Sequence, residues 1–195
     1  MTLDELRERL RESLTGRGRH HSRPPELIPA AVLVLVVERN GALFLVFTKR
    51  TEHVAHHKGQ FSFPGGIIEP EDLSEEAAAL REANEEVGLN PQDVEVIGLL
   101  DDLPGRAAPF VITPVLALAR RPMAFTPDPE EVERILEVPL AFLSNPANCR
   151  VEIWERDGES YPIHFFEYEG DVIWGVTGRI LKHFLELIPP SEERS

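Results

Sequence analysis

The residues with the clearest chemical potential are three glutamates, Glu82, Glu85 and Glu86. In a helix, their spacing of i, i+3 and i+4 places the three carboxylates within one arc about 100° wide. Carboxylates crowded on one face repel one another, and an isolated cluster of this kind is usually a solvated acidic face. The pair Gly65-Gly66 upstream favours a different interpretation. Glycine lets the backbone approach an ion or phosphate, and carbonyl and carboxylate oxygens are the ligands that Mg²⁺ and Mn²⁺ prefer.

Residues 75–87 have the sequence of a helix that would position these acids. Ser74 is a preferred N-cap residue, and Gly88 supplies the stop. The first turn is acidic, which the helix dipole favours, and no proline interrupts the strong helix formers that follow. The apolar positions that point away from the glutamates, and therefore toward a core, are Leu80, Ala83 and Val87.

Residues 81–89 resemble the second half of the Nudix box, R-E-U-x-E-E-x-G-U, at every fixed position. In the first half, Asp72 stands where the family carries glutamate, and one additional residue precedes Arg81. This longer spacing is similar to that of the coenzyme A pyrophosphatase branch of Nudix hydrolases. Other stretches that resemble this branch are 48–50, 59–66 and 174–177. Thr51 and Ala55 depart from its upstream pattern, which has Ser or Ala and then Arg at these positions.

The resemblance implies both a fold and a reaction. The fold is of the α/β (α+β) class, a Nudix-type mixed β-sheet sandwiched between helices. The reaction is metal-dependent hydrolysis of the diphosphate bond in a nucleoside diphosphate derivative, most specifically coenzyme A, giving 3′,5′-ADP and 4′-phosphopantetheine. Mg²⁺ or Mn²⁺ would neutralise the phosphates and lower the pKa of bound water. The implied metal ligands are Glu82, Glu85, Glu86 and the carbonyl of Gly66.

The resemblance also implies the remaining site residues. Glu130 or Glu131 is the candidate for a further acid near the metal or the attacking water, and the proton acceptor is open among these two, Glu82 and Glu85. Arg81 is grouped with the catalytic residues, although the family pattern gives it the task of pairing with acids and positioning the loop against the helix. The residues expected to bind substrate are Arg50, His57, Gln60 and Gly65.

Two alternative functions are compatible with the same fold. One is a pyrophosphatase that acts on ADP-ribose or a dinucleotide. The other is a Nudix domain that binds nucleotides as a sensor without cutting them. Non-catalytic relatives typically lose one or more glutamates of the box, and all three are present here. The glutamates therefore favour an enzyme whose partner is a small nucleotide.

Composition excludes several other classes of protein. The 195 residues, 42% of them hydrophobic, suit one domain with a sizeable core. A formal net charge of −14 argues against nucleic-acid and anionic-membrane partners, because both need a positive surface. No apolar run is long enough for a membrane span, and no signal-peptide pattern is present. The lone Cys149 suits a reducing compartment, so we expect a cytoplasmic monomer or homodimer.

The chain divides into three expected parts: an N-terminal helix and linker that pack on the main body (1–28), a Nudix domain (29–188) and a polar tail (189–195). The expected strands are 30–37, 43–48, 94–100, 110–118, 149–154 and 161–168. Residues 40–41 predict a tight hairpin turn, 130–136 a short helix and 174–187 an amphipathic helix. Pro114 is expected at an edge or bulge. The three histidines of loop 51–60 lack the further ligands that a zinc site requires.

Overall fold

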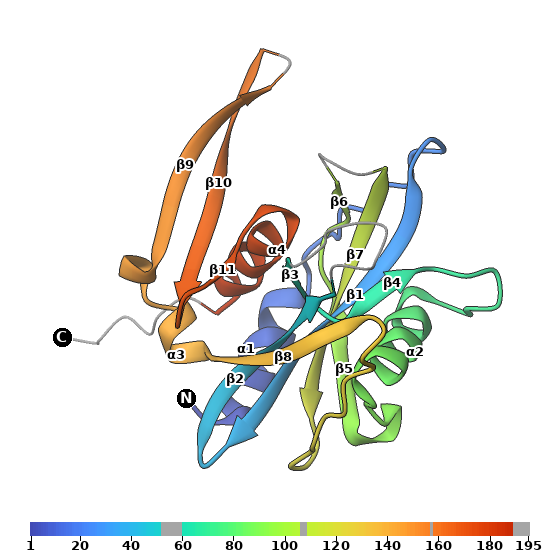
Figure 1. Ribbon diagram of the computed structural model, residues 1–195, viewed down its shortest axis with the longest axis vertical. Helices are drawn as coiled ribbons and strands as arrows, with labels where there is room; N and C mark the ends of the chain where they lie inside the picture. The colour runs from blue at the N-terminus through green and yellow to red at the C-terminus, as the bar shows by residue number, and fades with distance from the viewer. Residues whose placement is uncertain (52–59, 106–108, 157, 189–195) are drawn as a thin grey trace.

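The computed structural model describes residues 1–51, 60–105, 109–156 and 158–188 (Figure 1). They form a large mixed sheet with helices on both faces and a smaller antiparallel sheet, which confirms the expected fold class. The elements in chain order are α1 (Leu3–Leu14), β1 (Ile28–Arg39), β2 (Ala42–Arg50), β3 (Phe61–Ser62), β4 (Gly65–Ile67), α2 (Glu75–Val87), η1 (Pro91–Asp93), β5 (Val94–Leu99), β6 (Leu103–Pro104), β7 (Phe110–Ala119), β8 (Val132–Pro139), α3 (Leu140–Leu143), η2 (Pro146–Asn148), β9 (Cys149–Arg156), β10 (Glu159–Tyr168), β11 (Asp171–Ile173) and α4 (Gly175–Glu186).

Strand β1 is the centre of the large sheet, whose order is β3-β2-β1-β7-β5 with β4, β6 and β8 beside β1, β7 and β2. It runs parallel to β7 and antiparallel to β2 and β4. Leu33 and Leu35 belong to the core on one face, and Val34 and Val36 to the core on the other. A strand buried on both faces reads as a continuous apolar run, so the prediction for 30–37 is confirmed.

The two faces of the sheet carry different helices. On one face α2 packs through its small apolar residues Ala78, Ala79, Ala83 and Val87, which let the helix lie close to the strands. The core of the other face receives side chains from three helices, namely Leu6 and Leu10 of α1, Leu140 and Leu143 of α3, and Ile180, Leu181 and Phe184 of α4. The helix that carries the acids therefore packs on the sheet from its first turns to its last residue, Val87.

Two local signals in the sequence are confirmed. The Ser74 hydroxyl accepts from the backbone N–H of Ala77 at the start of α2, and Gly88 ends that helix in the left-handed conformation with φ of +68°. Asn40 and Gly41, with φ of 52° and 80°, form the turn between β1 and β2. Both features act over a few residues, which is why the sequence predicts them.

The helix expected at 130–136 is wrong, because residues 132–139 form strand β8 beside β2. Asp128 closes a turn just before the strand, since its carbonyl oxygen accepts from the N–H groups of Glu131 and Val132. Pairing with β2 gives the segment a ladder of backbone hydrogen bonds, and its β-branched residues suit a pleated surface. The pairing of this segment with β2 therefore outweighs its local preference for a helix.

Pro114 lies in an interior strand, so the expected edge is wrong, but it stands at an irregularity of the kind expected, where β5 ends and β6 begins with one more residue than β7 between the flanking pairs. It sits opposite Val32 of β1 in the parallel ladder between β1 and β7. Its carbonyl accepts from the N–H of Leu100, and the N and C=O of one strand residue point to the same side. The nitrogen of Pro114 therefore faces the break between β5 and β6. Neither strand pairs with this residue, so the absence of an N–H costs no ladder hydrogen bond.

The second sheet is a long hairpin of β9 and β10 with β11 at its edge, and it projects from the body beside α4 (Figure 1). These strands confirm the expected hairpin, and α4 confirms the amphipathic helix, with Ile180, Leu181 and Phe184 buried. Across the described part of the chain, no helix combines the length and the apolar character needed to cross a membrane.

Candidate active site

Strand β4 places two adjacent glycines against helix α2. Gly65 pairs with Val32 and Gly66 with Ala31 in the antiparallel ladder with β1. Gly65 has φ of +152°, and a Cβ there would lie 2.3 Å from the carbonyl oxygen of Ala31, so only glycine fits. A Cβ on Gly66 would lie 2.4 Å from the carboxylate of Glu82. The backbone of β4 is therefore in direct contact with the acids of α2.

Glu86 is a buried carboxylate at the centre of this contact, with 2% of its surface exposed. It accepts a hydrogen bond from the backbone N–H of Gly65 at 3.1 Å and another from Nη1 of Arg50 at 2.9 Å. Burial raises the pKa of Glu86 to about 7, against the opposing effects of Arg50 and Gly65, and the charges of Glu82 and Glu131 raise it further. The contacts with Arg50 and Gly65 therefore do not fully offset the free-energy cost of burying the ionised carboxylate of Glu86.

Arg81 joins the loop after β4 to helix α2. Its Nε and Nη2 atoms donate to the two carboxylate oxygens of Asp72 at 3.1 and 3.0 Å, and Nη2 also donates to the Ile67 carbonyl at 3.0 Å. Its Nη1 atom donates to Glu82 at 2.9 Å and to Glu85 at 3.0 Å. Burial raises the pKa of Glu82 although Arg81 opposes the shift. These hydrogen bonds of Arg81 with Asp72, Ile67, Glu82 and Glu85, here called the Arg81 clasp, hold the loop against the acidic face of the helix.

The structure separates the two candidates for the distal acid. Glu131 lies 3.6 Å from Nη2 of Arg50, and its charge raises the pKa of both Glu82 and Glu86. The hydrogen bonds of Glu130 are made by its backbone, with Thr51 Oγ1 and with the side chain of Asp128. Glu131 therefore belongs to the carboxylate cluster by contact, whereas Glu130 is a turn residue.

The expected substrate residues are only partly brought together. Arg50 contacts Glu86 directly, and its backbone N–H donates to the carbonyl of Gln60 at 3.1 Å. Gly65 donates to Glu86, as described above. His57 lies outside the described residues. Asp72, which the sequence marked only as a residue of the box, emerges as the anchor of Arg81, and its position after Gly66 was the signal for that role.

The donor set suits a hard divalent cation. Carboxylates of Glu82, Glu85 and Glu86 lie on one helix beside the backbone of Gly66, and two of them have raised pKa values. As the side chains lie, however, no group of three or more His, Cys, Asp and Glu residues within the described ranges is arranged to hold a metal ion. Arg50 and Arg81 donate to one oxygen of each of these carboxylates, so a cation would compete with the two arginines for Glu82, Glu85 and Glu86.

Replacing Gly66 by alanine tests the contact between β4 and α2. The new Cβ must displace the end of the Glu82 side chain, which is flexible, so we expect a folded protein that binds Mn²⁺ about 100-fold more weakly because the carboxylate of Glu82 is misplaced. Gly18→Ala is the matched control, because a Cβ there meets nothing within 4 Å. Circular dichroism and calorimetric titration with Mn²⁺ measure both variants. A Gly66→Ala protein with unchanged Mn²⁺ affinity would show that the contact has no bearing on cation binding.

The sequence of this chain is similar to those of known Nudix proteins. The NUDIX domain family matches residues 27–148, which is more than half of the chain. Nudix hydrolase 22, chloroplastic, of Arabidopsis thaliana is 38% identical over 185 residues, covering 90% of this chain and 61% of that protein. The protein named Uncharacterized Nudix hydrolase NudL of Photorhabdus laumondii is 33% identical over 159 residues, covering 82% of this chain and 84% of that protein.

The structural comparison supports the same fold. The crystal structure of a MutT/nudix family protein from Enterococcus faecalis matches 96% of this chain and 75% of its own, with a TM-score of 0.54 and 14% identity, which shows the fold alone. The chain spans 61% and 55% of the length of the two plant relatives that it matches, Nudix hydrolases 22 and 15. Because the family match contains both glycines, the Arg81 clasp and all three glutamates of α2, the chain belongs to the Nudix family.

Proposed function

We propose that the protein is a divalent-metal-dependent pyrophosphohydrolase that cleaves the diphosphate bond of nucleoside diphosphate derivatives. The observation that carries the proposal is the buried carboxylate of Glu86, with its pKa of about 7, beside Glu82 and the glycine pair. A carboxylate cluster disfavoured by burial and mutual repulsion gains stability when a cation joins it. Membership of the Nudix family supports the same chemistry.

Each residue then has a distinct task. Glu82, Glu85, Glu86 and the Gly66 carbonyl would hold Mg²⁺ or Mn²⁺, which supplies charge neutralisation and a lowered pKa for bound water. Arg81 holds the loop through Asp72 and so fixes the direction of β4. Arg50, shared between Glu86 and Glu131, presents a guanidinium that suits a phosphate oxygen. Glu131 is the candidate among the distal acids to accept the proton of the attacking water.

Coenzyme A is the substrate that we propose, with 3′,5′-ADP and 4′-phosphopantetheine as products. The sequence stretches at 59–66 and 174–177 that resemble the coenzyme A branch support it. Thr177 of α4 donates to the carbonyl of Phe61 at 3.1 Å, so these two distant stretches are in contact. ADP-ribose and dinucleotides remain the alternative substrates, and Ala55, in place of the arginine of the branch, favours testing them in parallel.

A substrate panel tests the proposal. Purified protein with Mg²⁺ or Mn²⁺ is incubated with coenzyme A, ADP-ribose, NADH and diadenosine polyphosphates, and the products are separated by chromatography. We expect the highest kcat/KM with coenzyme A and no turnover when a chelator removes the metal. An equal or higher kcat/KM with ADP-ribose would reject coenzyme A and retain the pyrophosphohydrolase. Nucleotide binding without hydrolysis of any compound would instead indicate a sensor.

A further inference from the structure

Three aromatic rings gather where the β9–β10 hairpin meets the start of α4. Phe165 and Trp174 are stacked, with ring centroids 5.9 Å apart and planes 8° from parallel. Trp154 lies 6.0 Å from Trp174 and 6.3 Å from Phe165. Together Trp154, Phe165 and Trp174 form an aromatic platform. Phe165 is buried and Trp174 half-buried, whereas Trp154 is 41% exposed, so the platform opens to solvent at Trp154.

Charged side chains of the hairpin contact two of the three rings. Arg150 lies opposite Phe165 in the strand register, and its guanidinium carbon is 4.3 Å from the centroid of the Phe165 ring. Ion pairs with Glu152 and Glu167 hold this guanidinium in place. The indole N–H of Trp154 donates to Glu152 at 2.8 Å. The indole N–H of Trp154 is thus satisfied within the hairpin, and 41% of the surface of Trp154 is exposed to solvent.

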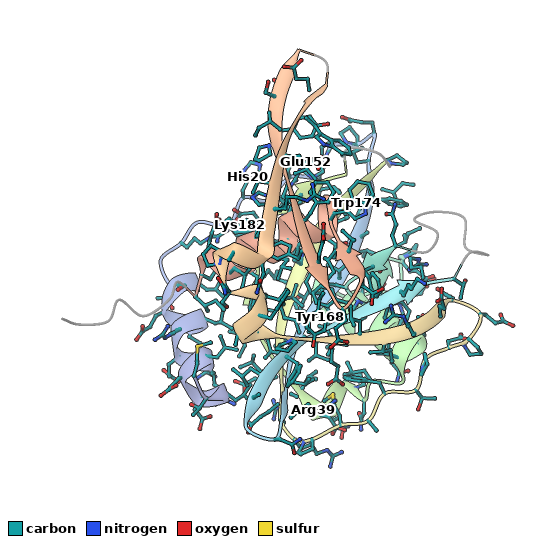
Figure 2. All side chains as sticks on the ribbon, turned by 60° about the vertical axis from the view of Figure 1, so that its left-hand side comes forward. His20, Arg39, Glu152, Tyr168, Trp174 and Lys182 are labelled. Carbon is teal, nitrogen blue, oxygen red and sulfur yellow. The ribbon has the colours of Figure 1, made fainter. Side chains whose placement is uncertain are left out.

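The platform is linked to the candidate active site through α4. Thr177, one turn after Trp174, donates to the carbonyl of Phe61, and Phe61 lies four residues before Gly65. Arg134 of β8 packs over the Phe61 ring at 5.1 Å and forms an ion pair with Asp171, which precedes α4. In Figure 2, Trp174 lies on the right of the hairpin and Lys182 of the same helix on its left. The Trp174 end of α4 is the end tied to the strand that leads to Gly65-Gly66.

We propose that the aromatic platform binds the planar base of the nucleotide substrate. Every nucleobase presents a π-face, and stacking on aromatic side chains contributes to affinity without requiring a particular base. Because the hydrogen bond from Trp154 to Glu152 and the stacking of Phe165 on Trp174 hold the rings before a ligand binds, little conformational freedom is lost on binding. The identification of the base as part of a substrate rests on the proposed function, whereas the stacking itself does not.

Intrinsic fluorescence gives a direct test, because the chain has two tryptophans and both belong to the platform. Wild-type protein is titrated with adenosine 5′-monophosphate, which contains no diphosphate bond to be cut. Ribose 5-phosphate, which lacks the base, is the control ligand. We expect saturable quenching of tryptophan emission by the nucleotide and none by the sugar phosphate. Emission that does not respond to the nucleotide overturns the proposal.

Variants separate stacking from a structural role. Trp154→Ala should weaken adenosine 5′-monophosphate binding about tenfold and raise KM by a similar factor, with kcat within about twofold, because only the base contact is lost. Trp154→Phe keeps a ring and should recover most of the affinity. Val172→Ala, an exposed position of β11 outside the platform, is the matched control and should change neither constant.

The outcomes separate this inference from the proposed function. Unchanged affinity and KM in Trp154→Ala reject the platform even if the protein hydrolyses coenzyme A. Specific quenching that Trp154→Ala weakens supports the platform even if no compound of the panel is hydrolysed. Tryptophan emission that changes with protein concentration in the absence of nucleotide would assign the platform to contact with a second copy of the chain, and it also overturns the proposal.

Discussion

Replacing Glu86 by glutamine should reduce kcat about a thousandfold, since the change removes a ligand of the proposed metal ion and forfeits several kcal/mol of charge stabilisation. The same change should leave the metal-free protein folded and at least as stable as the wild type. The folded state raises the pKa of Glu86 from the ordinary value to about 7, so its carboxylate binds protons more tightly in the folded than in the unfolded protein. Stability from this group therefore falls as pH rises from about 4.5 through 7.

Glutamine has no such ionisation, and its amide oxygen can still accept from Gly65. Above pH 7 we expect the metal-free variant to gain up to about 3.5 kcal/mol, which is the upper bound given by about 1.4 kcal/mol per pKa unit over the rise from 4.5 to about 7. Thermal unfolding with a chelator, metal titration and hydrolysis rates measure the three effects. Glu76→Gln removes the same charge from the first turn of α2, away from the cluster, and should retain activity. Near-full activity of Glu86→Gln in excess metal would refute the role assigned to Glu86.

Replacing Asp102 by alanine should have the largest effect on stability. This carboxylate is 3% exposed and accepts from Thr113 Oγ1 at 2.7 Å, from the N–H of Ser22 at 2.9 Å and from Arg19 at 2.5 Å. Removing it takes the acceptor from Thr113 and Ser22 and leaves Arg19 with its weaker contacts to Thr113 at 3.2 Å and Glu75 at 3.7 Å, which costs about 3 to 5 kcal/mol and roughly 10 °C in Tm. The segment after α1 would then lose its principal attachment to the sheet.

The effect should depend on pH in a defined direction. Burial raises the pKa of Asp102, but the hydrogen bonds from Thr113, Arg19 and Ser22 outweigh it and hold that pKa below its ordinary value. A lowered pKa stabilises the folded state above about pH 4, and this contribution is lost as pH falls through the folded pKa. The Tm difference between wild type and Asp102→Ala should therefore shrink below pH 4.

Asp101→Ala is the neighbouring control, with an expected cost of only about 1 kcal/mol, because its side chain is 28% exposed and pairs with Arg17 near the surface. Thermal unfolding between pH 3 and 7 gives all three proteins on one scale. A cost for Asp102→Ala no larger than that of Asp101→Ala would show that the buried network contributes little.

The sequence predicts those features that depend on neighbours in the chain. Ser74 and Gly88 bound α2, and Asn40-Gly41 forms the turn, because their hydrogen bonds and backbone angles are satisfied within a few residues. The continuous apolar run that identifies the buried strand at 30–37 is equally local. The fold class, the helix that carries the acids and the family could therefore be predicted.

The features that the sequence missed depend on distant partners. Residues 130–136 extend because β2 lies beside them, and nothing in their own composition reports that neighbour. Glu130 and Glu131 are equivalent in sequence, and only the position of Arg50, about 80 residues earlier, distinguishes them. Strands β3, β4 and β6 are two or three residues long, too short for a periodic pattern. The two-sided attachment of Glu86 to Gly65 and Arg50 likewise becomes visible only in three dimensions.

The parallel pairing of β1 with β7 has a consequence for synthesis on the ribosome. Ile28 pairs with Phe110, so β7 is synthesised about 80 residues after β1, and later than the other two neighbours of β1, which are β2 and β4. The hydroxyl of Ser13, in the first helix, donates to the carbonyl of Leu187, just beyond the last. The apolar faces of α1 and β1 therefore stay partly uncovered until the segments around Phe110 and Leu187 have been synthesised, and a chaperone would have reason to bind them during that time.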